Sequence, residues 1–282
     1  MNMNHAMLTD LYEFSMANGY CATLPHTDQA VFDIFYRTVP DHGSFVIAAG
    51  LQQVVEALQA FHFDDADIDY LRSLNLYSET FLNELATMKL ACRVTALPEG
   101  TPVFPREPLL TVEGPLMQVQ LLETLLLNLV NHQSLIATKA RRITAAAEGR
   151  PVMEFGARRA QGPDASVYGA RAAVIGGCAS TANVLAAQLF HIPAAGTMAH
   201  SWVESFSDEL TAFRAWAKVY PDNSALLVDT YDVLKSGVPN AITIFKELRA
   251  TGHQPVGIRI DSGDITQLAK QARVMLDTAG FQ

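Results

Sequence analysis

Cysteine is scarce in this chain. Its 282 residues include three cysteines, an odd number, and no two of them have the Cys-x-x-Cys spacing that is typical of zinc sites. Cys21, Cys92 and Cys178 stand apart from one another in the sequence. A disulfide framework and a zinc site are therefore both poorly supported, and buried, reduced thiols are the expectation.

Positive charge is also in short supply. The chain holds 20 lysines and arginines against 29 aspartates and glutamates, which gives a formal net charge of -9. An acidic protein repels nucleic acid on average, so we expect no nucleic-acid partner. The densest basic cluster, at residues 139–142, holds three charges at the end of an apolar run. A site for an anionic ligand must therefore be a local basic feature.

Long hydrophobic runs are missing. The most apolar run, residues 121–130, is interrupted by Glu123 and Asn128 and is too short to cross a bilayer. The N-terminal residues hold no basic region and no apolar stretch ahead of Asp10 and Glu13, so they do not resemble a signal peptide. Hydrophobic residues nevertheless make up 49% of the chain, which allows a sizeable core. We expect a cytoplasmic protein with no membrane association.

The first part of the chain mixes helices with strands. Residues 9–20 read as a helix, because Asp10 and Glu13 have the spacing of a capping box. The alternating residues 31–37 predict a strand, and the apolar period of residues 50–61 predicts a helix.

The sequence pattern changes in residues 93–148. Short β runs within residues 93–115 are separated by turns that contain proline, which predicts a compact antiparallel β unit. Residues 116–148 contain neither proline nor glycine and are rich in leucine and alanine, so we expect them to be mostly helical.

After residue 149 strands alternate with helices. Four short apolar runs, PVMEFG, AAGTMAH, ALLVDTYD and PVGIRIDSGD, each end in polar or charged residues. Helical patterns occupy residues 180–190, 209–219, 239–249 and 265–279. Strand-then-helix alternation implies parallel strands, and the C-terminal ends of such strands form the active site in α/β folds. A closed barrel needs more strands than these.

Two of the runs end in charged residues that could act together. In GIRIDSGD, Arg259 and Asp261 are two residues apart and point to the same side of a strand. They either bind a ligand with anionic and hydroxyl groups or pair with each other, and spacing alone slightly favours the ion pair. In VDTYD, Asp229 ends a strand, and capping of the next helix by Thr230 or Asp232 is the more ordinary role for this motif.

Four further residues are candidates for binding or catalysis. Arg158 and Arg159 follow PVMEFG and are suited to phosphate or carboxylate, although a solvated surface pair fits the sequence equally well. His200 follows a run of small residues, where both a catalytic and a structural role are compatible with the pattern. Tyr12 lies on the first predicted helix and by itself would be a core or interface aromatic.

Six motifs in order carry a specific resemblance. MLTDLYEF, FYRTVP, EFGARRAQGPDAS, GTMAHSW, VDTYD and GIRIDSGD resemble, in order and approximate spacing, the motifs of nicotinate phosphoribosyltransferases from residue 7 to the end. The resemblance implies an α/β fold in which an N-terminal α+β domain packs on an irregular, TIM-like and incomplete α/β barrel. We place the first domain at residues 1–135, with its antiparallel β unit near 93–115, and the partial barrel at residues 136–282.

The resemblance also implies a reaction and a set of residues. Nicotinate and phosphoribosyl pyrophosphate would give nicotinate mononucleotide and pyrophosphate, with ATP and Mg²⁺, in a homodimer whose active sites lie at the subunit interface. His200 would be the histidine that ATP phosphorylates, with Asp229 and Asp261 as the other catalytic residues. Tyr12 would come from the neighbouring subunit and stack on the pyridine ring opposite Phe155. The implied substrate-binding residues are Tyr12, Phe155, Arg158, Arg159, Thr197, Ser201, Arg259, Ser262 and Gly263, and no residue is assigned as a metal ligand.

One position bears on the choice of substrate. The related nicotinamide phosphoribosyltransferases carry an aspartate that accepts a hydrogen bond from the amide, in a motif that corresponds to residues 180–183 here. No acid occurs in that stretch, and Ala182 stands about where the aspartate would be. A carboxylate there would repel nicotinate, so its absence favours the acid over the amide.

The chain also departs from the family pattern. Family members are longer and carry further strands and glycine-bearing phosphate loops that have no counterpart here. We therefore expect an incomplete barrel with little or no activity if these residues are the whole product. A catalytically silent homologue that only dimerises is the main alternative, and an unrelated α/β enzyme such as a decarboxylase barrel is a third.

Overall fold

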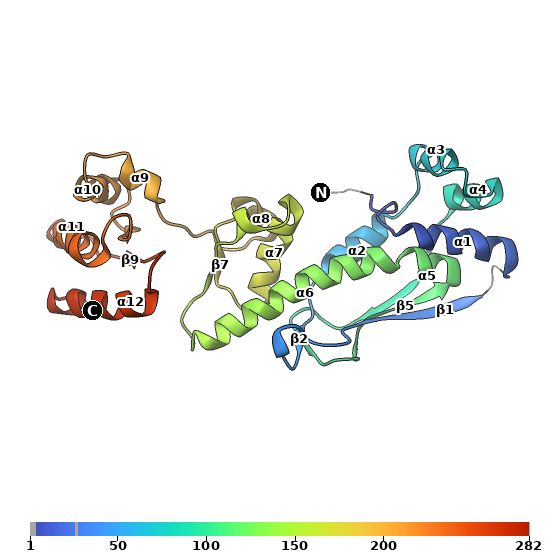
Figure 1. Ribbon diagram of the computed structural model, residues 1–282, viewed down its shortest axis with the longest axis horizontal. Helices are drawn as coiled ribbons and strands as arrows, with labels where there is room; N and C mark the ends of the chain where they lie inside the picture. Colours follow the sequence, from blue (N-terminus) through green and yellow to red (C-terminus); the bar gives the residue numbers. More distant parts are fainter. Residues whose placement is uncertain (1–3, 26–27, 282) are drawn as a thin grey trace. The chain divides into compact units, whose positions relative to one another are not determined.

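Contacts within the computed structural model divide the chain into two compact units (Figure 1). The structure describes residues 4–25 and 28–281. Unit 1 spans Met1–Ala195, unit 2 spans Gly196–Gln282, and each has its own hydrophobic core. The boundary predicted after residue 135 lies inside helix α6, Glu123–Ala146, and the predicted division into an N-terminal domain and a partial barrel stays a prediction.

Unit 1 combines helices with three small sheets. Its elements are α1 (Leu11–Thr23), β1 (Gln29–Phe35), η1 (Pro40–His42), β2 (Val46–Ile47), α2 (Leu51–Ala60), α3 (Asp65–Ser73), α4 (Glu79–Thr87), β3 (Arg93–Ala96), β4 (Pro102–Val103), β5 (Pro108–Pro115), α5 (Leu116–Leu121), α6 (Glu123–Ala146), β6 (Met153–Glu154), η2 (Ala157–Arg159), α7 (Pro163–Ile175), β7 (Ser180–Thr181) and α8 (Val184–Phe190).

Unit 2 alternates helices with two strands. Its elements are α9 (His200–Glu204), α10 (Glu209–Val219), β8 (Ala225–Leu227), the π-helical turn η3 (Val233–Gly237), α11 (Val238–Ala250), β9 (Gly257–Arg259) and α12 (Ile265–Thr278). The chain is therefore a mixed α/β protein, as its sequence predicts.

An antiparallel sheet with the order β1-β5-β3 organises the first half of unit 1. Strand β5 is central, and its side chains Leu110 and Val112 are buried, in keeping with the alternation expected of a strand with one face on a core. Helix α5 packs against both β1 and β5. The predicted antiparallel unit within residues 93–115 and the predicted strand near residues 31–37 are both confirmed.

Helix α6 is the long helix that the Leu- and Ala-rich run predicts. Its buried positions recur every three or four residues, which places one face of the helix on the core. Two hydroxyls on that face bind the backbone of the neighbouring segment: Ile47 N–H donates to Thr138 Oγ1 at 2.9 Å, and Ala49 N–H donates to Ser134 Oγ at 3.1 Å. Within the described ranges no helix has both the length and the apolar character needed to cross a membrane.

The start of α1 differs from the capping box that its sequence predicts. Asp10 is the N-cap residue but makes no side-chain capping hydrogen bond. Glu13 is instead fully buried, and its carboxylate accepts hydrogen bonds from the backbone N–H and hydroxyl of Thr124 and from the Thr9 hydroxyl. Burial raises the pKa of Glu13, although these hydrogen bonds act in the opposite direction. The tertiary contact to Thr124 therefore replaces the local cap.

The later part of the chain contains parallel strands in two pairs. In unit 1 β6 pairs with β7, and in unit 2 β8 pairs with β9. The helices predicted at residues 209–219, 239–249 and 265–279 are confirmed within a residue or so at each end.

Two element predictions in this region are wrong. The run AAGTMAH is not a strand, because only Ala194 makes a bridge, to Thr181, and the following residues form a loop before α9. The helix predicted at residues 180–190 begins at Val184, because Ser180–Thr181 form β7 beside β6. The fully buried Thr181 donates a hydrogen bond from its hydroxyl to Glu154 on β6. The helical period of the sequence gives no sign of this contact.

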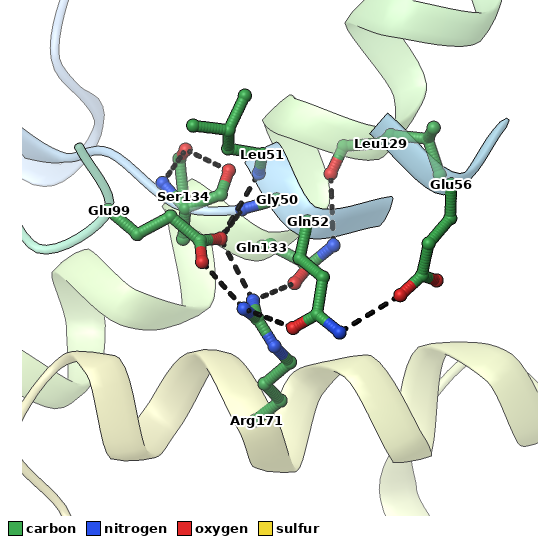
Figure 2. Close-up of polar contacts among 10 residues, drawn as sticks. Gly50, Leu51, Gln52, Glu56, Glu99, Leu129, Gln133, Ser134 and Arg171 are labelled. Carbon is green, nitrogen blue, oxygen red and sulfur yellow. Dashed lines mark hydrogen bonds and ion pairs between the residues drawn. The ribbon is translucent and has the colours of Figure 1, made fainter. Parts of the chain in front are cut away.

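A partly buried arginine connects four segments of unit 1 (Figure 2). Arg171 on α7 donates to both carboxylate oxygens of Glu99, at 2.5 and 2.8 Å, and to the side-chain oxygens of Gln52 and Gln133, at 2.9 and 3.3 Å. Glu99 in turn accepts from the backbone N–H groups of Gly50 and Leu51, at 2.6 and 3.1 Å, where α2 begins. A carboxylate at a helix N-terminus is favoured there by the helix dipole.

The environment of Glu99 keeps its carboxyl ionised. Burial alone would raise its pKa, but the hydrogen bonds and charge of Arg171 and the two backbone N–H donors outweigh burial, so the pKa of Glu99 is lowered from its usual 4.5. A lowered pKa means that the stabilisation is present at neutral pH and is lost as the pH falls through the pKa of the folded state.

Replacing Arg171 tests the importance of this connection. We expect Arg171→Met to lower the free energy of unfolding by about 2–3 kcal/mol at pH 7, because it leaves a mostly buried carboxylate without its cation. The difference between variant and wild type is expected to shrink as the pH falls through the lowered pKa of Glu99, because the carboxyl then becomes protonated. Urea unfolding at pH 7 and at a series of lower pH values measures both effects.

An exposed arginine supplies the control. Arg72 forms ion pairs with Asp69 and Glu79, but its side chain is 42% exposed. Arg72→Met is therefore expected to leave the free energy of unfolding almost unchanged. Equal effects from the two substitutions would contradict the special role of Arg171.

Candidate functional site

The carboxylate of Asp229 is the centre of a hydrogen-bonded cluster in unit 2. It follows β8, and its side chain is only 1% exposed. Oδ1 lies 3.2 Å from His200 Nε2, while Oδ2 accepts from the backbone N–H of Asp261 at 3.0 Å and from Ser262 Oγ at 2.6 Å. The residue therefore joins the ends of the parallel strands β8 and β9 to the first residue of α9.

These partners keep Asp229 charged. Burial alone would raise its pKa, but hydrogen bonds from Ser262, Asp261 and His200 outweigh burial, and the pKa of Asp229 lies below its usual 3.8. Buried carboxylates are stable only when their oxygens are satisfied in this way. Capping of the next turn, the more ordinary role for this motif, is performed by Asp232, which accepts from the N–H groups of Leu234 and Lys235.

His200 is the first residue of the short helix α9. Its side chain is 40% exposed, so the ring is held at one edge by Asp229 and remains open to solvent elsewhere. A carboxylate on one ring nitrogen fixes the tautomer and orientation of an imidazole. Ser201, the next residue, is exposed on the same helix.

Arg259 lies on β9 and bridges two other candidates. Nη1 donates to Thr197 Oγ1 at 2.8 Å, and Nη2 donates to Asp261 Oδ1 at 2.7 Å. The ion pair that the spacing slightly favoured is therefore present. Because the pair is partly exposed, it leaves both charges within reach of a ligand.

The backbone bends sharply in the turn that follows β9. Gly263 has φ +79°, a backbone conformation that residues other than glycine rarely adopt. A Cβ atom at this position would lie 3.0 Å from Leu268 Cδ1. Asp264 then accepts from Gln267 N–H and caps α12. The predicted residues Thr197, His200, Asp229, Arg259, Asp261 and Ser262 thus form one connected network in unit 2, and Gly263 continues its last turn.

Unit 1 holds the arginine-bearing loop. Phe155, Arg158 and Arg159 follow β6, and the two arginines end the short η2 turn. Both arginine side chains are exposed, and within the described part of the chain neither guanidinium has a hydrogen bond or ion pair. Two uncommitted guanidiniums side by side present several donors to a phosphate or carboxylate.

A cavity opens just past this loop, within unit 1. It has a volume of about 350 Å³ and is lined by residues of α6, α7, the N-terminal segment and the end of this loop, among them His5, His132, Gln161, Asp164 and Tyr168. This size is at the lower end of the range for small-molecule pockets.

Tyr12 stands on the exposed side of α1. Its side chain is 45% exposed, and its hydroxyl donates to Glu123 Oε1 at 3.0 Å. Desolvation and the neighbouring Glu123 carboxylate raise the pKa of Tyr12 to about 12, so the ring is a neutral phenol at physiological pH. Its hydroxyl is anchored, and much of the ring remains accessible for contact with another molecule.

Some residues at these strand ends could not be recognised as candidate site residues from the sequence. Glu154 and Thr181, for example, form a side-chain hydrogen bond between the ends of β6 and β7. A glutamate and a threonine in unrelated motifs look ordinary until the strands are paired. The one available hint is that Glu154 directly precedes Phe155 in the motif EFG.

Comparison with known proteins assigns the family. The model of the nicotinate phosphoribosyltransferase (NAPRTase) N-terminal domain matches residues 7–131, and that of the nicotinate phosphoribosyltransferase (NAPRTase) family matches residues 151–278. The chain belongs to the nicotinate phosphoribosyltransferase family. The resemblance carried by the six sequence motifs is therefore confirmed.

Individual relatives agree with this assignment. The chain is 47% identical over 277 residues to nicotinate phosphoribosyltransferase pncB2 of Mycobacterium tuberculosis and 45% identical over 273 residues to the nicotinate phosphoribosyltransferase of Bacillus subtilis. Its fold matches the crystal structure of human nicotinic acid phosphoribosyltransferase with a TM-score of 0.87 and 38% identity, over 96% of this chain and 64% of the human one.

The matches cover nearly all of this chain but not all of its relatives. They span 98% and 97% of this chain, against 59% of the mycobacterial protein and 55% of the Bacillus protein. The chain thus corresponds to a little over half of the length of these two relatives.

Replacing Asp229 tests whether the strand-end network holds unit 2 together. We expect Asp229→Asn to lower the free energy of unfolding by about 1–3 kcal/mol at pH 7, because an amide nitrogen cannot accept the hydrogen bonds now made to Oδ2 or Oδ1. Since the pKa of Asp229 is lowered, the wild type loses this advantage as the pH falls below 3.8. Chemical denaturation across pH 3–7 measures the difference.

The matched control is Asp222→Asn. Asp222 also contacts a histidine, His253, at 2.8 Å, but its side chain is 78% exposed. We expect almost no change in stability from this substitution. A loss in Asp229→Asn no larger than that in the control would show that the network does not stabilise unit 2.

Proposed function

We propose that this chain carries the catalytic centre of a nicotinate phosphoribosyltransferase. The protein joins nicotinate to phosphoribosyl pyrophosphate, releases pyrophosphate and feeds the synthesis of NAD. The main support is the network that joins His200, Asp229, Asp261 and Arg259 at neighbouring parallel strand ends, in a chain of this family. Such strand ends are where α/β enzymes place their reacting groups.

The chemistry of phosphoribosyl transfer matches the charges of these groups. As pyrophosphate leaves, the anomeric carbon acquires oxocarbenium character, and nearby carboxylates such as Asp261 stabilise it. Arg158 and Arg159 suit the anionic groups of the substrates. The ring nitrogen of nicotinate is already nucleophilic, so the enzyme must chiefly position the ring, which is the role we assign to Phe155.

We assign to His200 the role of accepting a phosphoryl group from ATP. If Nε2 carries the proton that faces Asp229, Nδ1 holds the lone pair. Nδ1 then attacks the γ-phosphorus, the bond from that phosphorus to the bridging oxygen breaks, and ADP leaves. The negative charge of Asp229 stabilises the positive imidazole that forms. ATP hydrolysis through this residue would drive the reaction toward product.

Magnesium fits this site as an ion held mainly by the substrate. Among the described residues no group of three or more acidic, histidine or cysteine side chains could hold a metal ion. Mg²⁺ at phosphate-transfer sites needs only one or two carboxylates in addition to substrate oxygens. The exposed carboxylate of Asp261 can serve as such a ligand, and the ion would neutralise the departing pyrophosphate.

We also propose that two copies of the protein complete each site. Leu8, Leu11 and Tyr12 are all exposed at the start of α1, which is unusual for neighbouring apolar residues in a monomer. In a homodimer the accessible ring of Tyr12 would stack on the pyridine ring in the site of the other subunit.

A direct assay tests the proposed reaction. The protein that contains this chain is expected to form nicotinate mononucleotide from nicotinate, phosphoribosyl pyrophosphate, ATP and Mg²⁺, as measured by chromatography of the product. A preference for nicotinamide or quinolinate would overturn the assignment. Dimerisation in sedimentation experiments without nicotinate binding in calorimetric titration would instead support the catalytically silent alternative.

Ala182 provides a test of substrate choice. Its N–H donates to the Glu154 carbonyl at 2.9 Å, so it lies beside the residue that precedes Phe155. We expect Ala182→Asp to weaken nicotinate binding by about 5- to 1000-fold, the range given by a Coulomb repulsion of about 1–4 kcal/mol. Nicotinamide, which is neutral, should be affected much less.

Titration of wild type and variant with both pyridines measures this selectivity. The control is Val184→Asp, which adds the same charge two residues further on, at a side chain that is 75% exposed at the start of α8. An unchanged ratio of nicotinate to nicotinamide affinity in Ala182→Asp would exclude Ala182 as a determinant of specificity.

A further inference from the structure

The carboxylate of Glu154 fixes the beginning of the loop that carries the two arginines. Glu154 ends β6, and its Oε1 accepts a hydrogen bond from the N–H of Gly156, two residues ahead. Its Oε2 accepts from Thr181 Oγ1 at 2.6 Å, and its carbonyl accepts from Ala182 N–H at 2.9 Å. Phe155, which lies between Glu154 and Gly156, is thereby held on both sides.

Thr181 is the residue that holds Glu154. It is fully buried on β7, and its hydroxyl both donates to Glu154 and accepts from the N–H of Asn183, at 2.9 Å. One hydroxyl can perform both functions because it has one donor and two acceptor positions. With its donor and one acceptor position in use, the hydroxyl is fixed in one orientation.

Asn183 continues the chain of hydrogen bonds to the other end of the loop. Its Oδ1 accepts from Ala186 N–H at 3.1 Å and caps α8, while its Nδ2 donates to Ser166 Oγ at 2.8 Å. Ser166 belongs to the first turn of α7, which begins where the loop ends. Both ends of residues 155–162 are therefore tied to the same segment, residues 180–183, which contains β7.

The loop between these ends combines a fixed backbone with uncommitted side chains. Arg159 N–H donates to the Gly156 carbonyl at 2.8 Å, which closes the η2 turn. Gly162 has φ +104°, so the chain reverses there in a conformation that favours glycine. Arg158 and Arg159 are exposed and have no partner within the described residues. A fixed backbone beneath solvated guanidiniums favours the binding of an anion, because little ordering is then required.

We propose that Glu154, Thr181, Asn183 and Ser166 are positioning residues for substrate binding. Their hydrogen bonds hold Phe155, Arg158 and Arg159 in the arrangement that binds a flat aromatic carboxylate, although none of the four needs to touch it. The inference rests on the proposed function, because it concerns the loop that is assigned to nicotinate. It also explains why the segment with the specificity position Ala182 is bonded directly to this loop.

Two substitutions that remove one hydroxyl each test the proposal. Thr181→Val removes the donor to Glu154 and keeps the side-chain shape, and Ser166→Ala removes the acceptor for Asn183 without disturbing the cap of α8. We expect hydrogen–deuterium exchange to become at least about tenfold faster at the amides of residues 156–162 in Thr181→Val. The Kd or KM for nicotinate should rise by about tenfold, whereas kcat should fall less.

Thr144→Val is the matched control. Thr144 donates to the carbonyl of Gly176 at 3.0 Å, at the far end of α7, so this variant also loses one hydroxyl bond to that helix. We expect it to leave exchange in residues 156–162 and nicotinate affinity unchanged. Thr181→Ser, which keeps the hydroxyl, should restore both properties toward wild type.

The two readouts separate this inference from the proposed function. If exchange in the loop and nicotinate affinity of Thr181→Val both match those of Thr144→Val, the positioning role is wrong. If the wild-type protein shows no nicotinate binding in the same titrations, the proposed function fails, and exchange still reports whether the four residues hold the loop. Faster exchange together with weaker nicotinate binding, rescued by Thr181→Ser, supports the inference.

Discussion

A carboxylate that is taken out of water must have its oxygens hydrogen bonded, and Asp229 meets this requirement with groups from two other segments. Its partners are Asp261 N–H and Ser262 Oγ after β9, and His200 at the start of α9. The geometry of the site is therefore a consequence of satisfying one buried charge. Moving any partner would leave Asp229 undersatisfied, so the arrangement has little freedom.

The same constraint recurs in unit 1 with different partners. Glu13 joins α1 to Thr124, Glu99 joins the start of α2 to Arg171 (Figure 2), and Glu154 joins β6 to Thr181. In each case an acid connects segments that are distant in the sequence. Acids of this kind fix relative positions as much as they add stability, because each tolerates only a few arrangements of donors.

Sequence periodicity predicted the elements that are stabilised by interactions between residues close in the sequence. It missed those that depend on hydrogen bonds to residues far away in the sequence. The helix at residues 209–219 and the antiparallel unit near 93–115 follow from pattern and turn residues alone. Strand β7 and the start of α1 could not be predicted from the pattern, because Thr181 and Glu13 form hydrogen bonds with residues elsewhere in the chain. The candidate residues of unit 2 were identified from the order of the sequence motifs. The contacts between them could be identified only once the fold was known. Glu154 carried no signal of its own, since its partner lies on a strand that the pattern assigned to a helix.

The internal hydrogen bonds of such acids reconcile a net charge of -9 with the anion site that we propose at Arg158 and Arg159. Within unit 1 the carboxylate of Glu154 accepts hydrogen bonds from internal donors, while Arg158 and Arg159 remain exposed and unpaired in the described part of the chain. Local potential depends on which charges are already neutralised and on their distance, and total charge is a poor guide to it. An acidic protein can therefore hold a local anion site of the kind proposed here where its nearby acids are hydrogen bonded to internal donors.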